Sequence, residues 1–270
     1  MKPLTSITRV LVAGVAAVAM TACGSTNLAP PSGTSPAAAA TSSTASLTGT
    51  VNVFAAASLQ ETFTTLKTQF EAAHPGVTVT PNFGASSALA QQINQGAPAD
   101  VFASASQTNM DQVVGAGAAS SFDPFASNVM EIAVPPANPA EVASTNDLAN
   151  PGVKVALCQS QVPCGSVAAK VLANAKIAVT PVSQEADVKA VLTKVQLGEV
   201  DAGVVYATDV KAAGDKVKGV EIARDVNAST SYPITALTKA PNPGAAAAFV
   251  AYVLSPEGQA VLKSGGFDGP

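Results

Sequence analysis

Residues 51–61 read VNVFAAASLQE and decide the fold class, because a short strand here leads directly into a helix. Val and Phe within 51–54 are typical of a buried strand. The sequence SLQE at 58–61 fits a capping box, in which a serine and a glutamate satisfy free amides at the start of a helix. Apolar residues then follow at helical spacing: Leu59, Phe63, Leu66 and Phe70. A strand followed by an amphipathic helix is the repeating unit of α/β proteins.

The same order continues along the chain in two series, which together predict an α/β fold with helices on both faces of mainly parallel sheets. The first series adds a strand at 77–80, a helix at 86–95 and a strand at 100–103. The second series has a strand at 153–157, helices at 166–174 and 185–197, and a strand at 201–206. Two closing helices are predicted at 245–254 and 256–263.

Two α/β series predict two lobes. The strand-like segments 129–134 and 233–237 flank the second series, so we expect them to cross between the lobes. Lobe I is then expected to comprise 50–128 and 233–270, and lobe II 129–232. Ligands of such sheets bind at the carboxyl ends of strands, which places the predicted site in a cleft between the lobes.

The first 22 residues have the pattern of an export signal. Lys2 and Arg9 supply the positive charge, and the apolar run at 10–20 is too short to span a bilayer as a helix. Residues 1–22 are therefore expected to be a signal peptide that is removed.

The signal ends in MTAC at 20–23, which resembles the lipobox of bacterial lipoproteins and makes Cys23 the expected lipid anchor. The alternative is an ordinary signal with an incidental cysteine. Residues 23–49 consist almost wholly of Ala, Ser, Thr, Pro and Gly and carry no charge, so they are expected to form a tether that spans on the order of 30 Å. The expected location is the outer face of the cell membrane.

Composition excludes several classes of protein. The chain has 270 residues, 47% of them hydrophobic, and a formal net charge of −4, which is typical of a globular protein rather than a disordered one. Nucleic-acid binding requires clustered Lys and Arg, and the sequence has no basic stripe.

The turns that follow the predicted strands hold the candidate ligand-binding residues. Ser58, Ser86, Cys164 and Tyr206 lie at or beside such turns, where free backbone amides and the helix dipole favour an anion. None of these turns carries Lys or Arg, so the pattern favours an anion that is already fully deprotonated and is bound by hydroxyl and amide donors. The alternative is that Ser58 and Ser86 only cap their helices.

Several segments together resemble the molybdate-binding proteins of bacterial ABC importers. They read VFAAASL at 53–59, NFGASSALA at 82–90, QINQGAPADVF at 92–102, GVVYATD at 203–209 and YPI at 232–234, and the likeness extends over 50–267. The resemblance implies a type II periplasmic-binding-protein fold, with two mixed sheets covered by helices and joined by two crossing strands. It also implies a monomer that closes on molybdate or tungstate, needs no cofactor, and delivers the anion to an ABC permease.

Carried over residue by residue, the resemblance assigns the anion to five positions. They are the hydroxyl and amide of Ser58, the hydroxyl and amide of Ser86, the amides of Cys164 and Val188, and the hydroxyl of Tyr206. Val188 has an apolar side chain on the buried face of its predicted helix, so residue chemistry alone would place it in the core.

Cys164 departs from the family pattern, which usually has a small residue without a thiol at this position. Cys158 lies six residues earlier, and export to an oxidising compartment favours a disulfide between them. The alternative is metal ligation, which would need further ligands in a chain whose one histidine is His74.

Two other functions remain as alternatives. GASSA at 84–88 differs from the G-x-S-x-G nucleophile elbow of serine hydrolases only in its last residue. A catalytic triad would need His74, however, and His74 lies in a His-Pro-Gly sequence that ends a predicted helix. The second alternative is a carrier of sulfate or phosphate, since these oxyanions also bind at helix ends. Iron binding by a tyrosine cluster is disfavoured, because the chain has three tyrosines in all.

Overall fold

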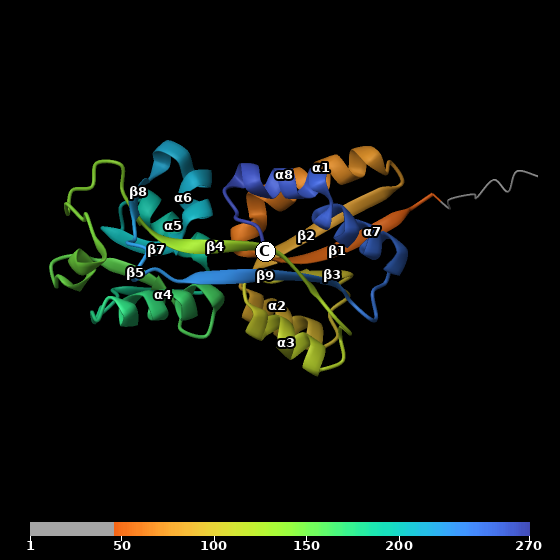
Figure 1. Cartoon of the computed structure of the whole chain (residues 1–270), viewed down its shortest axis with the longest axis horizontal. Coiled ribbons are helices and arrows are strands. Elements are labelled where there is room, and N and C mark those ends of the chain that lie inside the picture. Colours follow the sequence, from red (N-terminus) through yellow and green to blue (C-terminus); the bar gives the residue numbers. More distant parts are fainter. Residues whose placement is uncertain (1–45) are drawn as a thin grey trace, which may run out of the picture. The chain divides into compact units, whose positions relative to one another are not determined.

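The computed structural model describes residues 46–270 of the chain (Figure 1). The predicted signal peptide, the lipid anchor Cys23 and the tether up to residue 45 lie outside the described residues. The described part forms two lobes, each with its own sheet region and its own helices.

The first lobe is built on three parallel strands: β1 (Gly49–Ala56), β2 (Val77–Gly84) and β3 (Val101–Ala103). Its strand order is β2-β1-β3, with β9 added beside β3. The covering helices are α1 (Gln60–Ala73), α2 (Ser86–Asn94), α3 (Gln107–Gly115), α7 (Pro243–Leu254) and α8 (Pro256–Gly265). Figure 1 shows α1, α7 and α8 on one side of the strands and α2 and α3 on the other.

The second lobe repeats this plan around β5 (Val155–Cys158), β6 (Ser183–Glu185), β7 (Ala202–Tyr206) and β8 (Lys218–Glu221). β5 is parallel to both β6 and β7, and β8 pairs with β4. The helices of this lobe are α4 (Pro163–Asn174), α5 (Val188–Gln196) and α6 (Ala207–Ala213). Three short 3-10 helices complete the described chain: η1 (Ala57–Leu59), η2 (Thr145–Ala149) and η3 (Gly214–Lys216).

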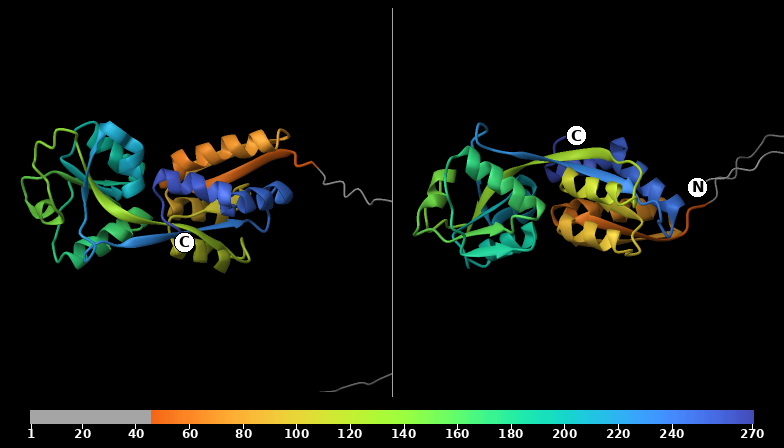
Figure 2. Two further views of the ribbon diagram at one scale, coloured as in Figure 1. Left: turned by 45° about the horizontal axis from the view of Figure 1, so that its top comes forward. Right: turned by 90° about the horizontal axis from the view of Figure 1, so that it is seen from below.

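Two long antiparallel strands, β4 (Asp123–Val134) and β9 (Ser229–Ala236), join the lobes (Figure 2). β4 pairs with β9 over its first half and with β7 over its second half, so a single strand belongs to both sheet regions. This arrangement confirms the predicted two-lobed α/β fold with two crossing strands.

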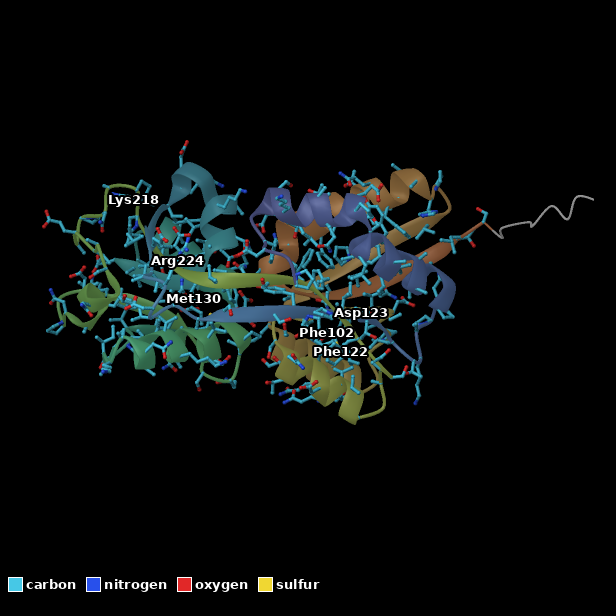
Figure 3. All side chains as sticks on the ribbon, in the orientation of Figure 1. Phe102, Phe122, Asp123, Met130, Lys218 and Arg224 are labelled. Carbon is cyan, nitrogen blue, oxygen red and sulfur yellow. A yellow bond between two sulfur atoms is a disulfide. The ribbon has the colours of Figure 1, made fainter. Side chains whose placement is uncertain are left out.

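Each lobe has a separate apolar core. In the first lobe, Phe63, Phe70, Phe125 and Phe249 pack around one another with ring centroids 5.2 to 6.2 Å apart. Phe102 faces α2 and α3 in a second layer of that lobe, whereas Met130 belongs to the core of the other lobe (Figure 3). Separate cores allow each lobe to keep its shape when the lobes move.

The structure corrects several local predictions. α1 begins at Gln60 with Leu59 at its N-cap, and no side chain caps it, so the predicted capping box at Ser58 is wrong. α4 begins at Pro163 rather than at 166, because proline is favoured in the first turn of a helix. The predicted helix at 185–197 starts at Val188 and is preceded by the short strand β6.

Among residues 46–270, no single helix has the length and apolar character needed to cross a membrane. α7 and α8 would reach that length only as a pair, and they bend by 61° where they meet.

Candidate functional site

The five residues predicted to bind an anion lie around one pocket, at the carboxyl ends of the strands. Each follows a strand: Ser58 follows β1, Ser86 follows β2, Cys164 follows β5, Val188 follows β6, and Tyr206 ends β7. The cavity is small, with a volume of about 20 Å³. A space this narrow suits one compact solute, and both lobes contribute to its wall.

Among residues 46–270, the Ser86 hydroxyl accepts a hydrogen bond but has no acceptor for its own proton. Ser86 is the first residue of α2, its side chain is 1% exposed, and its Oγ accepts a hydrogen bond of 2.9 Å from the Ala105 amide. No side chain caps α2, and its first two amides, those of Ser86 and Ser87, lie before any carbonyl group of the helix that could accept from them. Ser86 thus offers donors to the pocket and does not serve as an N-cap.

Ser58 is oriented by residues from distant parts of the chain. Its Oγ lies 2.8 Å from the Tyr232 hydroxyl, and Asn128 Nδ2 donates to that same hydroxyl at 3.5 Å and to Thr208 Oγ1 at 2.7 Å. Asn128 Oδ1 accepts from the Val129 amide, which fixes the orientation of the Asn128 amide group. The bond to Tyr232 holds the Ser58 hydroxyl in place at the wall of the pocket.

Two helices of the second lobe direct their N-termini to the same pocket. Cys164 follows Pro163, which has no amide proton, so the Cys164 amide is the first donor of α4. In α5, the Asp187 carboxylate accepts from the amides of Lys189 and Ala190, but the Val188 amide is not among its donors. The first amides of both helices are therefore available, and the helix dipoles favour an anion beside them.

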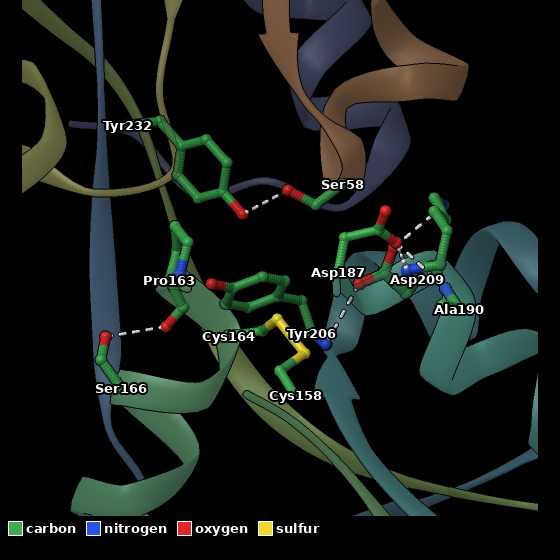
Figure 4. Close-up of a disulfide and its surroundings, with 11 residues drawn as sticks. Ser58, Cys158, Pro163, Cys164, Ser166, Asp187, Ala190, Tyr206, Asp209 and Tyr232 are labelled. Carbon is green, nitrogen blue, oxygen red and sulfur yellow. Dashed lines mark hydrogen bonds and ion pairs between the residues drawn. A yellow bond between two sulfur atoms is a disulfide. The ribbon is translucent and has the colours of Figure 1, made fainter. Parts of the chain in front are cut away.

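Tyr206 supplies a buried donor. Its side chain is 1% exposed, and its hydroxyl has no hydrogen-bond partner among residues 46–270. Burial, and then the proximity of Tyr232 and Asp209, raises the pKa of Tyr206 well above its usual value, so the hydroxyl stays protonated. Figure 4 shows its ring between Tyr232 and the disulfide. An unpaired buried hydroxyl is unfavourable, and a bound acceptor would relieve it.

The predicted disulfide between Cys158 and Cys164 is confirmed (Figure 4). It links the end of β5 to the first turn of α4, and in the loop-entropy description such a short loop contributes about 2 kcal/mol of stability. Both thiols are consumed by the bond, so they do not ligate a metal. The described residues also contain no group of three His, Cys, Asp or Glu side chains placed to hold a metal ion.

Gly165 allows α4 to approach the disulfide loop closely. A Cβ atom at this position would lie 2.0 Å from the Gln159 carbonyl oxygen, which is backbone and has little freedom to move. Glycine is therefore required at the point where the Cys164 amide is positioned.

The donors that line the pocket are neutral, and the carboxylate of Asp187, which also lines it, accepts from the amides of Lys189 and Ala190. None of its lining residues, all within the described part of the chain, is a lysine, arginine or histidine. The serine-hydrolase alternative has no support here, because His74 ends α1 and packs against Phe70 instead of lying near Ser58 or Ser86. The arrangement offers hydrogen-bond donors that suit an anion, and its lining offers no imidazole to activate a serine.

Known proteins with similar sequences and folds are extracellular binding proteins. A family of bacterial extracellular solute-binding proteins matches residues 51–268. The chain is 42% identical over 219 residues to the molybdate-binding protein ModA of Mycobacterium tuberculosis strain H37Rv, a match that covers 81% of this chain and 84% of that protein.

Solved structures that share the fold of this chain are named for different ligands. The periplasmic molybdate-binding protein of Azotobacter vinelandii matches with a TM-score of 0.71 and 20% identity, covering 82% of this chain and 99% of that one. The sulfate-binding protein SubI of Mycobacterium tuberculosis matches with a TM-score of 0.72 and 18% identity, covering 81% of this chain and 86% of that one. The fold alone therefore does not select the ligand.

Proposed function

Because this chain belongs to the family of bacterial extracellular solute-binding proteins, we propose that it binds molybdate in the pocket between its two lobes. Tungstate, an oxyanion of the same shape and charge, is proposed as a second ligand. The observation that carries the proposal is the buried Tyr206 hydroxyl, which has no hydrogen-bond partner in the described part of the chain and lines a pocket with further donors.

The proposed ligand set combines donors from both lobes. The first lobe supplies the hydroxyls and amides of Ser58 and Ser86, and the second lobe supplies the amides of Cys164 and Val188 and the Tyr206 hydroxyl. A ligand bound by both lobes favours the closed arrangement over the open one, since only the closed arrangement completes the set of contacts. The protein would thus act as a binding protein and not as an enzyme.

A sulfate-binding function is the second candidate, and the fold match to SubI supports it. Sulfate is smaller than molybdate and would accept from the same donors, so the size of the pocket decides between the two.

Thermal unfolding distinguishes the two candidate functions. It is measured on residues 23–270 carrying Cys23→Ser, with molybdate, tungstate, sulfate or phosphate at equal concentration. A ligand at one hundred times its Kd adds about 2.7 kcal/mol of stability.

We expect molybdate and tungstate to raise the melting temperature and sulfate and phosphate to leave it unchanged. A shift with sulfate alone would replace the proposed ligand, and no shift with any of the four anions would contradict the proposal of an oxyanion site.

We further propose that Cys23 is acylated and that residues 23–49 tether a monomer beside an ABC permease, to which it delivers the anion. The lipobox-like sequence and the uncharged segment after it support this arrangement. Labelling of expressing cells with a radioactive fatty acid tests it: the unaltered protein should carry the label, and the Cys23→Ala variant should not.

A further inference from the structure

Lys189, the residue after Val188, binds carboxylates from both lobes. Its ammonium nitrogen lies 2.9 and 2.8 Å from the two carboxylate oxygens of Glu61, on α1 of the first lobe. It also lies 2.9 Å from Asp209 Oδ1, on α6 of the second lobe. Among the ion pairs of residues 46–270, Lys189–Glu61 is the one that joins the two lobes.

The two carboxylates that pair with Lys189 differ in burial, so their ion pairs differ in how easily they separate. The Asp209 side chain is fully buried within the same lobe, and its other oxygen accepts from the Tyr206 amide. Glu61 is 48% exposed and stands on the opposite lobe. A buried carboxylate needs its counter-charge at all times, whereas an exposed one is readily hydrated when its partner moves away.

Lys189 remains charged in either arrangement. Burial alone would lower its pKa, but the Asp209 and Glu61 carboxylates outweigh that effect and raise the pKa above its usual value. Separation of the lobes would therefore leave a cation on α5, held by Asp209 and directed at the opposite lobe.

We propose that Lys189 is a positioning residue for anion capture: its contact with Glu61 forms as the lobes close and slows release of the bound anion. The proposed anion site includes the neighbouring Val188 amide at the start of the same helix, so one rigid element would make both the ion pair and a ligand contact. This proposal takes the identity of the anion from the proposed function. The movement of the lobes does not depend on which anion binds.

The test compares Glu61→Gln with Glu71→Gln. Glu71 is also on α1 and is also paired with a lysine, but its partner is Lys67 on the same helix. In residues 23–270 carrying Cys23→Ser, molybdate association and dissociation rates are measured by stopped flow, and Kd by calorimetry. We expect Glu61→Gln to raise the dissociation rate about two- to fivefold and to leave the association rate unchanged. Glu71→Gln should change neither rate.

Two further measurements separate closure from simple loss of stability. The melting temperature without ligand should be the same for Glu61→Gln and the unaltered protein, and the difference in dissociation rate should shrink in 1 M NaCl, because salt screens an exposed ion pair. Unchanged dissociation in Glu61→Gln, or an equal effect of Glu71→Gln, would overturn the proposal while leaving molybdate binding intact.

A ligand-independent measurement keeps the proposal testable if molybdate is not the ligand. Spin labels on the two lobes of the ligand-free protein should report a longer average distance in Glu61→Gln than in Glu71→Gln. Equal distances would overturn the role of Lys189, whereas failure of the unaltered protein to bind molybdate would overturn only the proposed function.

Discussion

The Ser58 hydroxyl oxygen lies 2.8 Å from the Tyr232 hydroxyl oxygen, although 174 residues separate the two in sequence. Ser58 stands at the end of the first strand of the sheet, and Tyr232 stands on the crossing strand β9. This bond ties a wall of the pocket to the connection between the lobes.

Tyr232→Phe removes the hydroxyl that is hydrogen-bonded to Ser58. The Ser58 hydroxyl is then free to turn, and one buried hydrogen bond is lost, which typically contributes about 1 kcal/mol. We expect molybdate binding to weaken about fivefold, measured by calorimetry. Tyr252→Phe is the matched control, because the Tyr252 hydroxyl bonds to Gln69 on the surface and should leave the Kd unchanged.

Tyr206→Phe should change affinity and stability in opposite directions. The ligand loses one donor, which weakens binding by roughly 1.5 to 3 kcal/mol, or roughly 10- to 150-fold. The ligand-free protein loses an unpaired buried hydroxyl, so its melting temperature should rise. Calorimetry and thermal unfolding of the same variant check both effects. An unchanged Kd would remove Tyr206 from the site.

Gly165→Ala should lower both stability and affinity. The added methyl group would meet the Gln159 carbonyl oxygen, so the first turn of α4 must shift, and the Cys164 amide shifts with it. Overpacking of this kind typically costs about 1 to 3 kcal/mol. Gly115→Ala serves as the control, because a Cβ atom at that helical position contacts nothing within 4 Å. A Gly165→Ala protein with normal melting temperature and Kd would contradict the close approach of the helix.

Glu131→Gln should stabilise the protein at neutral pH but not in acid. Burial, and then repulsion from Glu221 on the paired strand β8, raises the pKa of Glu131. The folded protein therefore holds this proton at pH values where the unfolded chain has released it, so the carboxyl's contribution to stability falls as pH rises above its usual pKa.

The melting temperatures of Glu131→Gln and the unaltered protein should differ most above neutral pH and converge near pH 4. Glu221→Gln should give a smaller increase, because it removes the repulsion and leaves the burial. An equal increase at every pH would mean that ionisation of Glu131 is not the cause.

The sequence was informative wherever function depends on side-chain chemistry or on regular periodicity. Ser86 and Tyr206 were recognisable as hydroxyls at the ends of predicted strands, and both lie in the pocket. Val188 was predicted only through family resemblance. Any residue type can supply a backbone amide, so the sequence does not mark such a ligand. The amide is exposed because α5 starts after β6, and the three polar residues of β6 do not predict a strand.

Local patterns failed where a distant contact outweighed a local one. SLQE at 58–61 is compatible with a capping box, but the Ser58 hydroxyl bonds to Tyr232 and the helix begins two residues later. α3 and α6 were not predicted, because they are short and their buried residues include polar side chains such as Asn109, Thr208 and Asp209. Such elements are specified by their tertiary environment more than by periodicity.

The position of the crossing strands also sets an order for folding. The sheet of the first lobe contains β1 to β3 from the start of the described chain and β9 from near its end, while α7 and α8 that cover it come last of all. The sheet of the second lobe is assembled from a continuous internal stretch together with the second half of β4. Contacts between residues far apart in sequence form slowly. When the unfolded protein refolds, we therefore expect the second lobe to become resistant to protease first, and the first lobe only after the C-terminal helices have packed onto it.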